Sequence, residues 1–194
     1  MPPKKLITKN SILEAAARFV IKEGFSSLNA RRLAKELGCS TKPIYAEFGS
    51  MGAMTEELLS LAFSEYSKFI NERKKLGRYP EYKAYGMAYL AFAAERTEMY
   101  KLLFMTDAIS RPEERDIHND RDRQIMNLSQ GLGISKEYAE KIQLSMWIFT
   151  HGLASLLVSG VIPYSEEVLS EMMSAEYQAL AAYYVDKERG NEGK

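Results

Sequence analysis

The chain has 194 residues and a mass of 22.0 kDa, enough for one large domain or for two smaller ones. Hydrophobic residues make up 46% and charged residues 27% of the sequence, fractions typical of globular domains that exclude intrinsic disorder and collagen-like repeats. The 26 basic and 26 acidic side chains cancel, so the charge of the whole chain does not indicate a polyanionic partner.

Charge is nevertheless distributed unevenly along the chain. Residues 1–50 contain 9 lysines and arginines but only 4 glutamates, a net charge of +5. Residues 51–194 contain the other 17 basic and 22 acidic side chains, a net charge of −5. This asymmetry indicates that the amino-terminal segment faces a polyanion and that the remainder does not.

The single cysteine, Cys39, excludes an internal disulfide framework and a Cys-clustered zinc site, and we expect neither a metal nor another cofactor. The first residues lack the apolar stretch of a secretory signal, which favours a cytoplasmic protein. Residues 142–165 contain no Asp, Glu, Lys or Arg, but they include several polar side chains, and Pro163 lies near their end. We therefore expect a buried helix there rather than a membrane span.

The first fifty residues predict three helices, because apolar residues such as Ile12, Ala16, Phe19 and Val20 recur at helical spacing. The predicted boundaries are Thr8 and Gly24 for the first helix, Asn29 and Gly38 for the second, and Ser40 as the N-cap of a third that reaches Phe48. Pro43 falls in the first turn of this third helix, where its missing N–H is tolerated.

The rest of the chain also has helical periodicity. A long helix is predicted after Ser50, Pro80 opens one that extends to about Glu95, and residues 110–113 form the capping box of another. Ser135 is expected to cap the apolar helix that Pro163 ends, and Ser165 precedes the last helix. No tight turn joins two alternating strands, so the sequence predicts an all-α fold of about nine helices.

Residues 28–48 have the pattern of a helix-turn-helix. Two short helices meet at Gly38, which permits the turn, and Ala34 is small where the two helices must approach each other. The basic side chains of this segment are Arg31, Arg32, Lys35 and Lys42. Ser40, Thr41 and Lys42 lie at the amino terminus of the second helix, the part of a recognition helix that contacts base edges.

Residues from Thr8 to about Leu59 resemble the TetR family of bacterial one-component regulators. The residues that carry the resemblance are Ile12, Ala16, Phe19, Gly24-Phe25, Arg32-Leu33-Ala34, Leu37-Gly38-Cys39-Ser40, Tyr45 and Phe48. The resemblance implies that Tyr45 packs against a phosphate and that Thr41 and Lys42 lie nearest the bases.

Two positions depart from the family pattern. Glu47 stands where the family often has His, and Met51 stands where a Lys often opens the fourth helix. The loss of that lysine removes one contact to the DNA backbone. Affinity should then depend more on Lys4, Lys5, Arg31 and Arg32.

Farther along the chain, Trp147-x-x-x-His151-Gly152-Leu153 resembles a Trp-His-Gly signature in the effector domains of one branch of that family. The resemblance implies a helix-turn-helix DNA-binding domain in residues 1–50 and a helical regulatory and dimerisation domain in residues 51–194. It also implies that the last two helices pair with their counterparts in a homodimer.

These patterns predict a homodimeric, ligand-responsive regulator, a repressor that an apolar or aromatic small molecule releases from a palindromic double-stranded DNA operator. Candidate ligand contacts are Met87, Met99, Phe104, Met126, Trp147 and His151. The methionines are also explained as ordinary core residues, since thioethers fill irregular gaps. A histidine in such a position is more often a buried residue with a hydrogen bond than a ligand contact, and this interpretation of His151 is the favoured one.

An enzyme is not expected, because the chain has two histidines and lacks a nucleophile elbow or a phosphate-binding glycine loop. The competing class is a dimeric all-α small-molecule binding or adaptor protein whose DNA-reading end has degenerated. Glu47 and Met51 favour that alternative. A salt titration of DNA binding separates the two classes, because phosphate neutralisation makes affinity fall steeply with salt.

Overall fold

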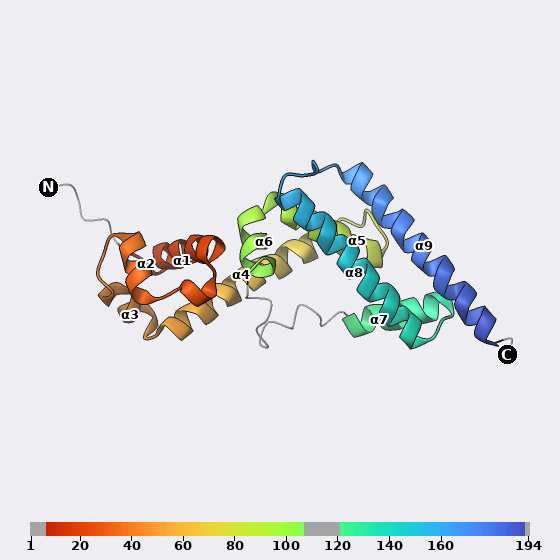
Figure 1. Ribbon diagram of the computed structural model, residues 1–194, viewed down its shortest axis with the longest axis horizontal. Helices are drawn as coiled ribbons and strands as arrows, with labels where there is room; N and C mark the ends of the chain where they lie inside the picture. The colour runs from red at the N-terminus through yellow and green to blue at the C-terminus, as the bar shows by residue number, and fades with distance from the viewer. Residues whose placement is uncertain (1–6, 107–120, 193–194) are drawn as a thin grey trace. The chain divides into compact units, whose positions relative to one another are not determined.

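The computed structural model describes residues 7–106 and 121–192 (Figure 1). Within these ranges the chain forms nine α-helices and one 3-10 turn and no strand, which confirms the predicted all-α fold. The elements are α1 (Lys9–Glu23), η1 (Phe25–Ser27), α2 (Ala30–Leu37), α3 (Lys42–Phe48), α4 (Met51–Lys74), α5 (Glu81–Glu95), α6 (Thr97–Phe104), α7 (Arg121–Leu132), α8 (Lys136–Val158) and α9 (Glu166–Glu192). The capping box predicted at residues 110–113 lies outside the described residues, as do Lys4 and Lys5.

The described residues divide into two compact units. The first contains residues 7–66 and 98–106, and the second contains residues 67–97 and 121–192. The long helix α4 is continuous across residue 66, where the first unit ends. The boundary predicted between residues 50 and 51 is a functional one, between a DNA-reading segment and a regulatory segment, and it stays a prediction.

The core of the first unit forms where α1 contacts both α2 and α3. Ile12 and Val20 of α1, Leu33 of α2 and Ile44 of α3 are completely buried. The predicted boundaries of α1 are confirmed: Thr8 and Ser11 form a capping box, and Gly24 ends the helix with a φ of 78°. Removing these apolar side chains from water is the main force that holds the three short helices together.

The first unit also includes the start of α4 and all of α6. The Lys9 ammonium lies 2.7 Å from the Glu57 carboxylate, which links α1 to α4. The Phe104 ring of α6 lies 5.3 Å from the Tyr66 ring of α4 in an edge-to-face arrangement. Aromatic pairs prefer this geometry because the positive edge of one ring faces the negative face of the other.

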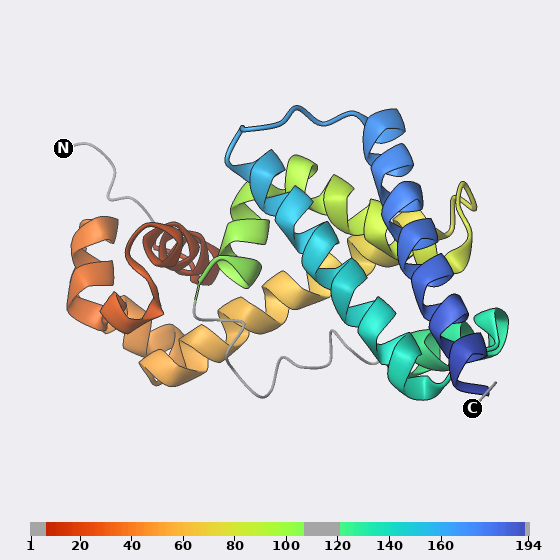
Figure 2. The same ribbon diagram turned by 45° about the vertical axis from the view of Figure 1, so that its right-hand side comes forward.

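In the second unit, α8 contacts α5, α7 and α9, and it runs antiparallel to α9 (Figure 2). Gly86 permits close packing of α5 here, because a Cβ at this position would lie 2.5 Å from the Met173 Cε of α9 and 3.9 Å from Thr150 of α8. Most of α5 is buried, including Met87, Leu90 and Phe92. This helix is therefore the centre of the second core.

Two predicted helix ends are wrong. Ser40 does not cap α3: the N-cap is Thr41, which already has helical dihedral angles, and no side chain caps the helix. Pro43 explains the difference, because it occupies the second helical position and offers no N–H to a capping hydroxyl.

Pro163 does not end α8 either. The helix ends at Val158, and Gly160 with a φ of 73° turns the chain so that the Val161 N–H reaches the Leu156 carbonyl.

Other predicted boundaries are confirmed. Pro80 directly precedes α5, which ends at Glu95. The Ser135 side chain accepts a hydrogen bond from the Tyr138 N–H at the start of α8, and the Ser165 side chain does the same for Val168 at the start of α9. No helix in the described ranges combines the length and the apolar character that a membrane span needs.

Candidate nucleic-acid interface

The candidate interface is built from α2, a tight turn and α3. The Asn29 Oδ1 atom accepts a hydrogen bond of 3.0 Å from the Arg32 N–H and so fixes the start of α2. At the other end, Gly38 is left-handed, with φ 68° and ψ 33°, and the Cys39 N–H reaches the Ala34 carbonyl at 3.0 Å. Both boundaries of α2 were predicted, and together they fix the direction in which the chain enters α3.

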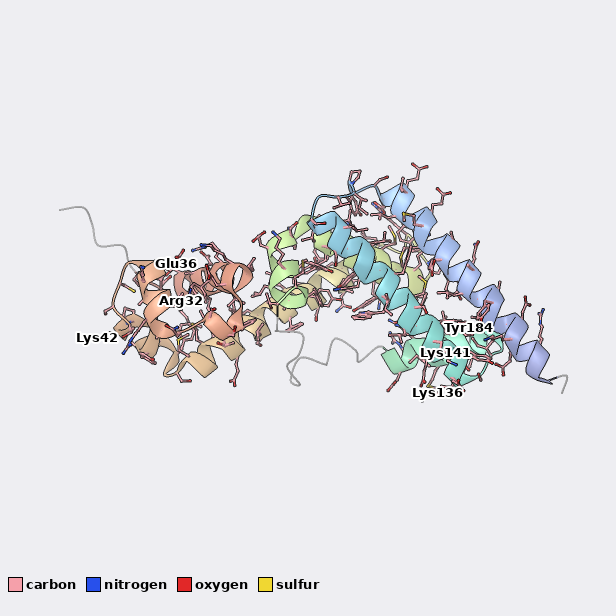
Figure 3. The ribbon with its side chains drawn as sticks, in the orientation of Figure 1. Arg32, Glu36, Lys42, Lys136, Lys141 and Tyr184 are labelled. Carbon is pink, nitrogen blue, oxygen red and sulfur yellow. The ribbon has the colours of Figure 1, made fainter. Side chains whose placement is uncertain are left out.

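The helix α3 has one buried face and one exposed face. Ile44 and Phe48 point into the core of the first unit, while Lys42, Tyr45 and Ala46 are exposed. Tyr45 exposes 47% of its surface although it is an aromatic residue on a short helix. Figure 3 shows Lys42 at the outer edge of this unit, at the beginning of α3. The exposed face of α3 can therefore meet a flat or grooved partner.

Two basic side chains of α2, Arg31 and Lys35, are exposed and form no ion pair with the described residues. Lys42 of α3 is exposed in the same way. Unpaired cations on a surface retain their full attraction for an external anion, because no internal carboxylate neutralises them. Among the predicted basic side chains that the structure describes, these three have no internal carboxylate partner and can bind phosphate.

Arg32 has a different environment from its neighbour Arg31. Its Nη2 atom lies 3.3 Å from the Glu23 carboxylate, Nη1 donates to the Ser27 carbonyl at 3.4 Å, and the guanidinium lies 4.9 Å from the centre of the Phe19 ring. Arg32 therefore holds α2 against α1. The sequence analysis missed this role. The signal is the pair Phe19 and Glu23, which lie one helical turn apart on α1.

The acidic side chains Glu36 and Glu47 are also exposed in this part of the chain. Glu47 lies on α3, two residues after Tyr45. A carboxylate in this position repels phosphate and can accept a hydrogen bond from cytosine N4. If this face of α3 meets duplex DNA, the effect of Glu47 would therefore depend on the base sequence.

The six predicted ligand-binding residues are divided between the two units. Met99 and Phe104 belong to the first unit, and the other four belong to the second. In the second unit Met87 is buried, whereas Met126 and Trp147 expose 56% and 42% of their surface. Their assignment to an effector site stays a prediction.

His151 connects the surface of the second unit to its core. The Trp147 ring stacks on the imidazole at 5.4 Å, and the Tyr89 hydroxyl lies 2.9 Å from the His151 Nδ1 atom. Burial lowers the pKa of His151 below its ordinary value of 6.5. The imidazole is therefore neutral near pH 7.

Two hollows of the second unit differ in size. One, beside Met87, Tyr79 and Tyr164, has a volume of about 20 Å³, which is room for a single water molecule. The other has a volume of about 220 Å³ and is lined by residues of α7, the first turn of α5 and Tyr177 of α9. None of the six predicted ligand contacts lines the larger hollow.

Apolar side chains are exposed along α8 and α9. On α8 they are Leu144, Trp147, Ile148 and Leu156, and on α9 they are Val168, Met172 and Tyr183. Leu144, Ile148 and Leu156 recur at multiples of four residues, so they lie along one stripe of the helix. A stripe of this kind is typical of a surface that another helix covers.

Two segments of the chain match known protein families. Residues 12–58 match the family described as "Bacterial regulatory proteins, tetR family", and residues 82–180 match the family described as "Tetracyclin repressor-like, C-terminal domain". The second segment alone is just over half of the chain. A comparison with curated proteins found no match.

Three solved structures share the fold. A TetR-like transcriptional regulator from Rhodococcus sp. RHA1 is 18% identical, with a TM-score of 0.67 over 98% of this chain and 100% of that one. A protein from Shewanella sp. PV-4, described as a TetR family transcription regulator, is 18% identical, with a TM-score of 0.58 over 94% and 98% of the two chains. The multidrug binding protein EbrR in complex with imidazole is 17% identical, with a TM-score of 0.52 over 89% and 96%.

Proposed function

Because this chain belongs to the TetR family of bacterial transcription regulators, we propose that it represses transcription by binding a palindromic operator as a homodimer, and that a small molecule releases it. The single observation that carries the proposal is the exposed face of α3, which follows a left-handed turn at Gly38 and begins with the unpaired Lys42.

The proposed role of α3 is to enter the major groove of duplex DNA. Lys42 has the reach and charge to donate to guanine O6 and N7, and the small Ala46, four residues later on the same exposed face, suits the methyl group of thymine. Ser40 and Thr41 offer hydroxyl donors at the start of the helix, and Tyr45 offers its hydroxyl to a phosphate. Sequence preference thus comes from Lys42 and Ala46, and register comes from the residues around them.

Phosphate contacts are assigned to the cations of α2. Arg31 and Lys35 are unpaired and can neutralise phosphates directly, whereas Arg32 must share its guanidinium with Glu23. We therefore assign Arg32 mainly to the positioning of α2. From the sequence alone, we also assign Lys4 and Lys5 to phosphate contacts, because each adds a positive charge near the start of the chain.

Dimerisation is proposed through α8 and α9. Leu144, Ile148 and Leu156 form the exposed apolar stripe of α8. Val168 and Met172 of α9 are also apolar and exposed. A second copy that presents the same two helices covers both stripes in a four-helix interface. A two-fold symmetric dimer carries two copies of α3, so the operator should have the same two-fold symmetry.

Release by a small molecule requires that the ligand and the operator favour different arrangements of the dimer. A ligand that prefers the arrangement with the wrong spacing of the two α3 helices lowers operator affinity, and operator lowers ligand affinity by the same factor. A coupling of about 1–3 kcal/mol, or roughly 5- to 150-fold, is sufficient. The helix α4 is continuous from the first unit into the second, so it can carry this coupling.

The proposal is tested by selecting duplexes that bind the full chain from a pool of random 30-base-pair DNA. We expect the enriched sequences to contain two half-sites related by a two-fold axis. An enriched sequence without such symmetry contradicts the dimeric reading of DNA. The absence of any enrichment, together with no binding to duplex DNA in dilute buffer, favours the small-molecule binding or adaptor protein with a degenerate DNA-reading end.

A further inference from the structure

Glu166, the first residue of α9, is bonded to the segment that joins α4 to α5. Its two carboxylate oxygens lie 3.3 and 3.4 Å from the Arg78 Nη1 atom, and its Oε1 atom accepts a hydrogen bond of 3.0 Å from the Tyr79 hydroxyl. Both donors follow closely after Lys74, where α4 ends. The start of α9 is therefore bonded to the chain directly beyond α4.

The two donors of this bond differ in exposure. Arg78 is exposed, and an exposed ion pair contributes little because water and salt screen it. Tyr79 is partly buried, and a hydrogen bond from a neutral hydroxyl to a carboxylate is stronger than one between two neutral groups. The Tyr79 hydroxyl is thus the more important of the two donors to Glu166.

The last turns of α4 are also attached to α5. Arg73 forms an ion pair with Glu95, the last residue of α5, and its guanidinium lies 5.2 Å from the centre of the Phe69 ring. The Phe69 ring in turn lies 5.4 Å from the completely buried Phe92 ring of α5, in an edge-to-face arrangement. The end of α4 is therefore held by α5 directly and by α9 through Tyr79.

The contacts with α5 and with α9 lie next to each other. Arg73, Arg78, Tyr79 and Glu166 all line the small hollow of the second unit, as does Tyr164, two residues before α9 begins. A shift of the α4–α5 segment against α9 would therefore reach the last turn of α4. The bonds to Glu166 are polar and partly exposed, so they can break without unfolding of the second unit.

This arrangement matters for a dimer that reads DNA. In the proposed dimer α9 is part of the interface, and α4 continues from the second unit into the first, which contains α3. A continuous helix transmits a change in direction from one end to the other. The direction of α4 in each copy therefore contributes to the separation of the two α3 helices, which must match the spacing of the half-sites.

We infer that Glu166 is a positioning residue of the regulator. Through Tyr79, and to a lesser degree Arg78, it fixes the end of α4 to the interface helix α9 and so determines which half-site spacing the dimer accepts. This inference rests on the proposed function, because it requires a dimer that reads two half-sites. Glu166 acts through α4, and no DNA contact is assigned to it.

The first test measures hydrogen exchange of the backbone amides of residues 70–79 in the full chain without DNA. E166A removes the acceptor and Y79F removes the donor. We expect each change to speed exchange of these amides about 3- to 10-fold, because the end of α4 opens more often when a hydrogen bond is lost.

E167A is the matched control for this experiment. Glu167 is the next residue of α9, is exposed, and forms no ion pair with the described residues. It also lies in the first turn, so E167A alters the interaction with the helix dipole in the same way as E166A. We expect E167A to exchange like the natural chain over residues 70–79.

The second test compares the selected operator with two duplexes whose half-sites lie one base pair closer together or farther apart. Fluorescence anisotropy gives the three affinities. We expect the natural chain and E167A to prefer the selected spacing, and E166A and Y79F to reduce this preference about 3-fold or more. A loss of stability alone would lower all three affinities by the same factor, so the ratio reports positioning. Light scattering should give the same mass for E166A and the natural chain.

The inference is overturned if residues 70–79 exchange as slowly in E166A as in E167A, or if E166A keeps the spacing preference of the natural chain. A monomeric E166A also overturns it, since Glu166 would then belong to the interface itself. The exchange test needs no DNA and therefore separates this inference from the proposed function. A natural chain that binds no duplex overturns the proposed function, whereas faster exchange in E166A and Y79F still supports the bond between Glu166 and the end of α4.

Discussion

Lys42 contacts either a base or a phosphate in the proposed complex, and the two roles predict different effects of K42A on DNA affinity. K42A should weaken binding to the selected operator by about 1–3 kcal/mol, and the loss should vary when individual operator bases are changed, because a base contact discriminates between bases. Quantitative band-shift titrations against the operator and its single-base variants measure this. K35A is the matched control on α2, and we expect it to weaken all duplexes equally.

An equal loss for K42A on operator and random duplexes would reassign Lys42 to a phosphate. The family assignment does not depend on that outcome, since it rests on the matches over residues 12–58 and 82–180.

His151 should make stability depend on pH. Because burial lowers its pKa in the folded chain, the unfolded chain binds a proton that the folded chain does not, once the pH falls below about 6.5. The contribution of His151 to the free energy of unfolding should therefore be constant above about pH 6.5. It should decrease as the pH falls from there towards the lowered pKa of the folded chain. Urea unfolding at pH 7.5, 6.5 and 5.5 measures the effect, and H151Q should remove it.

Y89F is the control for this experiment. It deletes the hydroxyl that lies 2.9 Å from the His151 Nδ1 atom but keeps the titrating imidazole, so the pH dependence should persist at a lower overall stability. An H151Q variant with the same slope as the natural chain would assign the pH dependence to other groups.

Residue environments were predictable where a single helix determines them. The spacing of Ile44 and Phe48 on α3 implies that Lys42 is exposed, and the i, i+4 spacing of Trp147 and His151 implies that they are neighbours, as the stacked rings show. The pairing of Arg32 with Glu23 was not predictable in this way, because it depends on how α1 and α2 cross. The same holds for the larger hollow of the second unit, which needs residues from three helices that are distant in the sequence.

At the scale of the elements, the turn at Gly38 fixes the direction of α3. Its left-handed conformation costs a residue with a Cβ about 1–2 kcal/mol. We expect G38A to lower the free energy of unfolding by about that amount, measured by urea denaturation. G131A is the matched control, because Gly131 lies in α7 without a positive φ and without a neighbour within 4 Å of a Cβ, so this change should stabilise by about 0.5 kcal/mol.

A G38A variant as stable as the natural chain would show that the turn relaxes. In that case the predicted direction of α3 would not depend on glycine at this position.

Most helix boundaries followed from local chemistry, as with Asn29 and Gly38 around α2. Two helix ends were predicted wrongly, the start of α3 and the end of α8. In each case a nearby residue outweighed the one on which the prediction relied. At the start of α3 the missing N–H of Pro43 overrides the capping preference of Ser40. At the end of α8 a positive-φ glycine, Gly160, stops the helix before Pro163 can.

At the scale of the whole molecule, dimerisation through α8 and α9 makes a prediction about mass. Ile148 exposes 57% of its surface on the stripe assigned to the interface, and I148E would place a charge in a covered apolar contact. We expect light scattering to give twice 22.0 kDa for the natural chain and 22.0 kDa for I148E. L61E is the matched control, because Leu61 of α4 is similarly exposed but lies outside the stripe.

The single tryptophan reports on the same interface. Trp147 exposes 42% of its surface in one copy of the chain, so its emission should shift to longer wavelength when I148E separates the subunits. A monomeric natural chain, or an I148E variant that stays dimeric, would contradict the interface assigned to α8 and α9.

The most direct test of DNA binding by two coupled α3 helices is a titration of labelled operator duplex with the full chain between 50 and 200 mM salt, followed by fluorescence anisotropy. We expect two protomers to bind each duplex. The logarithm of the association constant should fall with the logarithm of the salt concentration with a slope of roughly −5 to −9, as six to ten phosphate contacts require. One protomer per duplex, or an affinity that does not change with salt, would contradict the central claim.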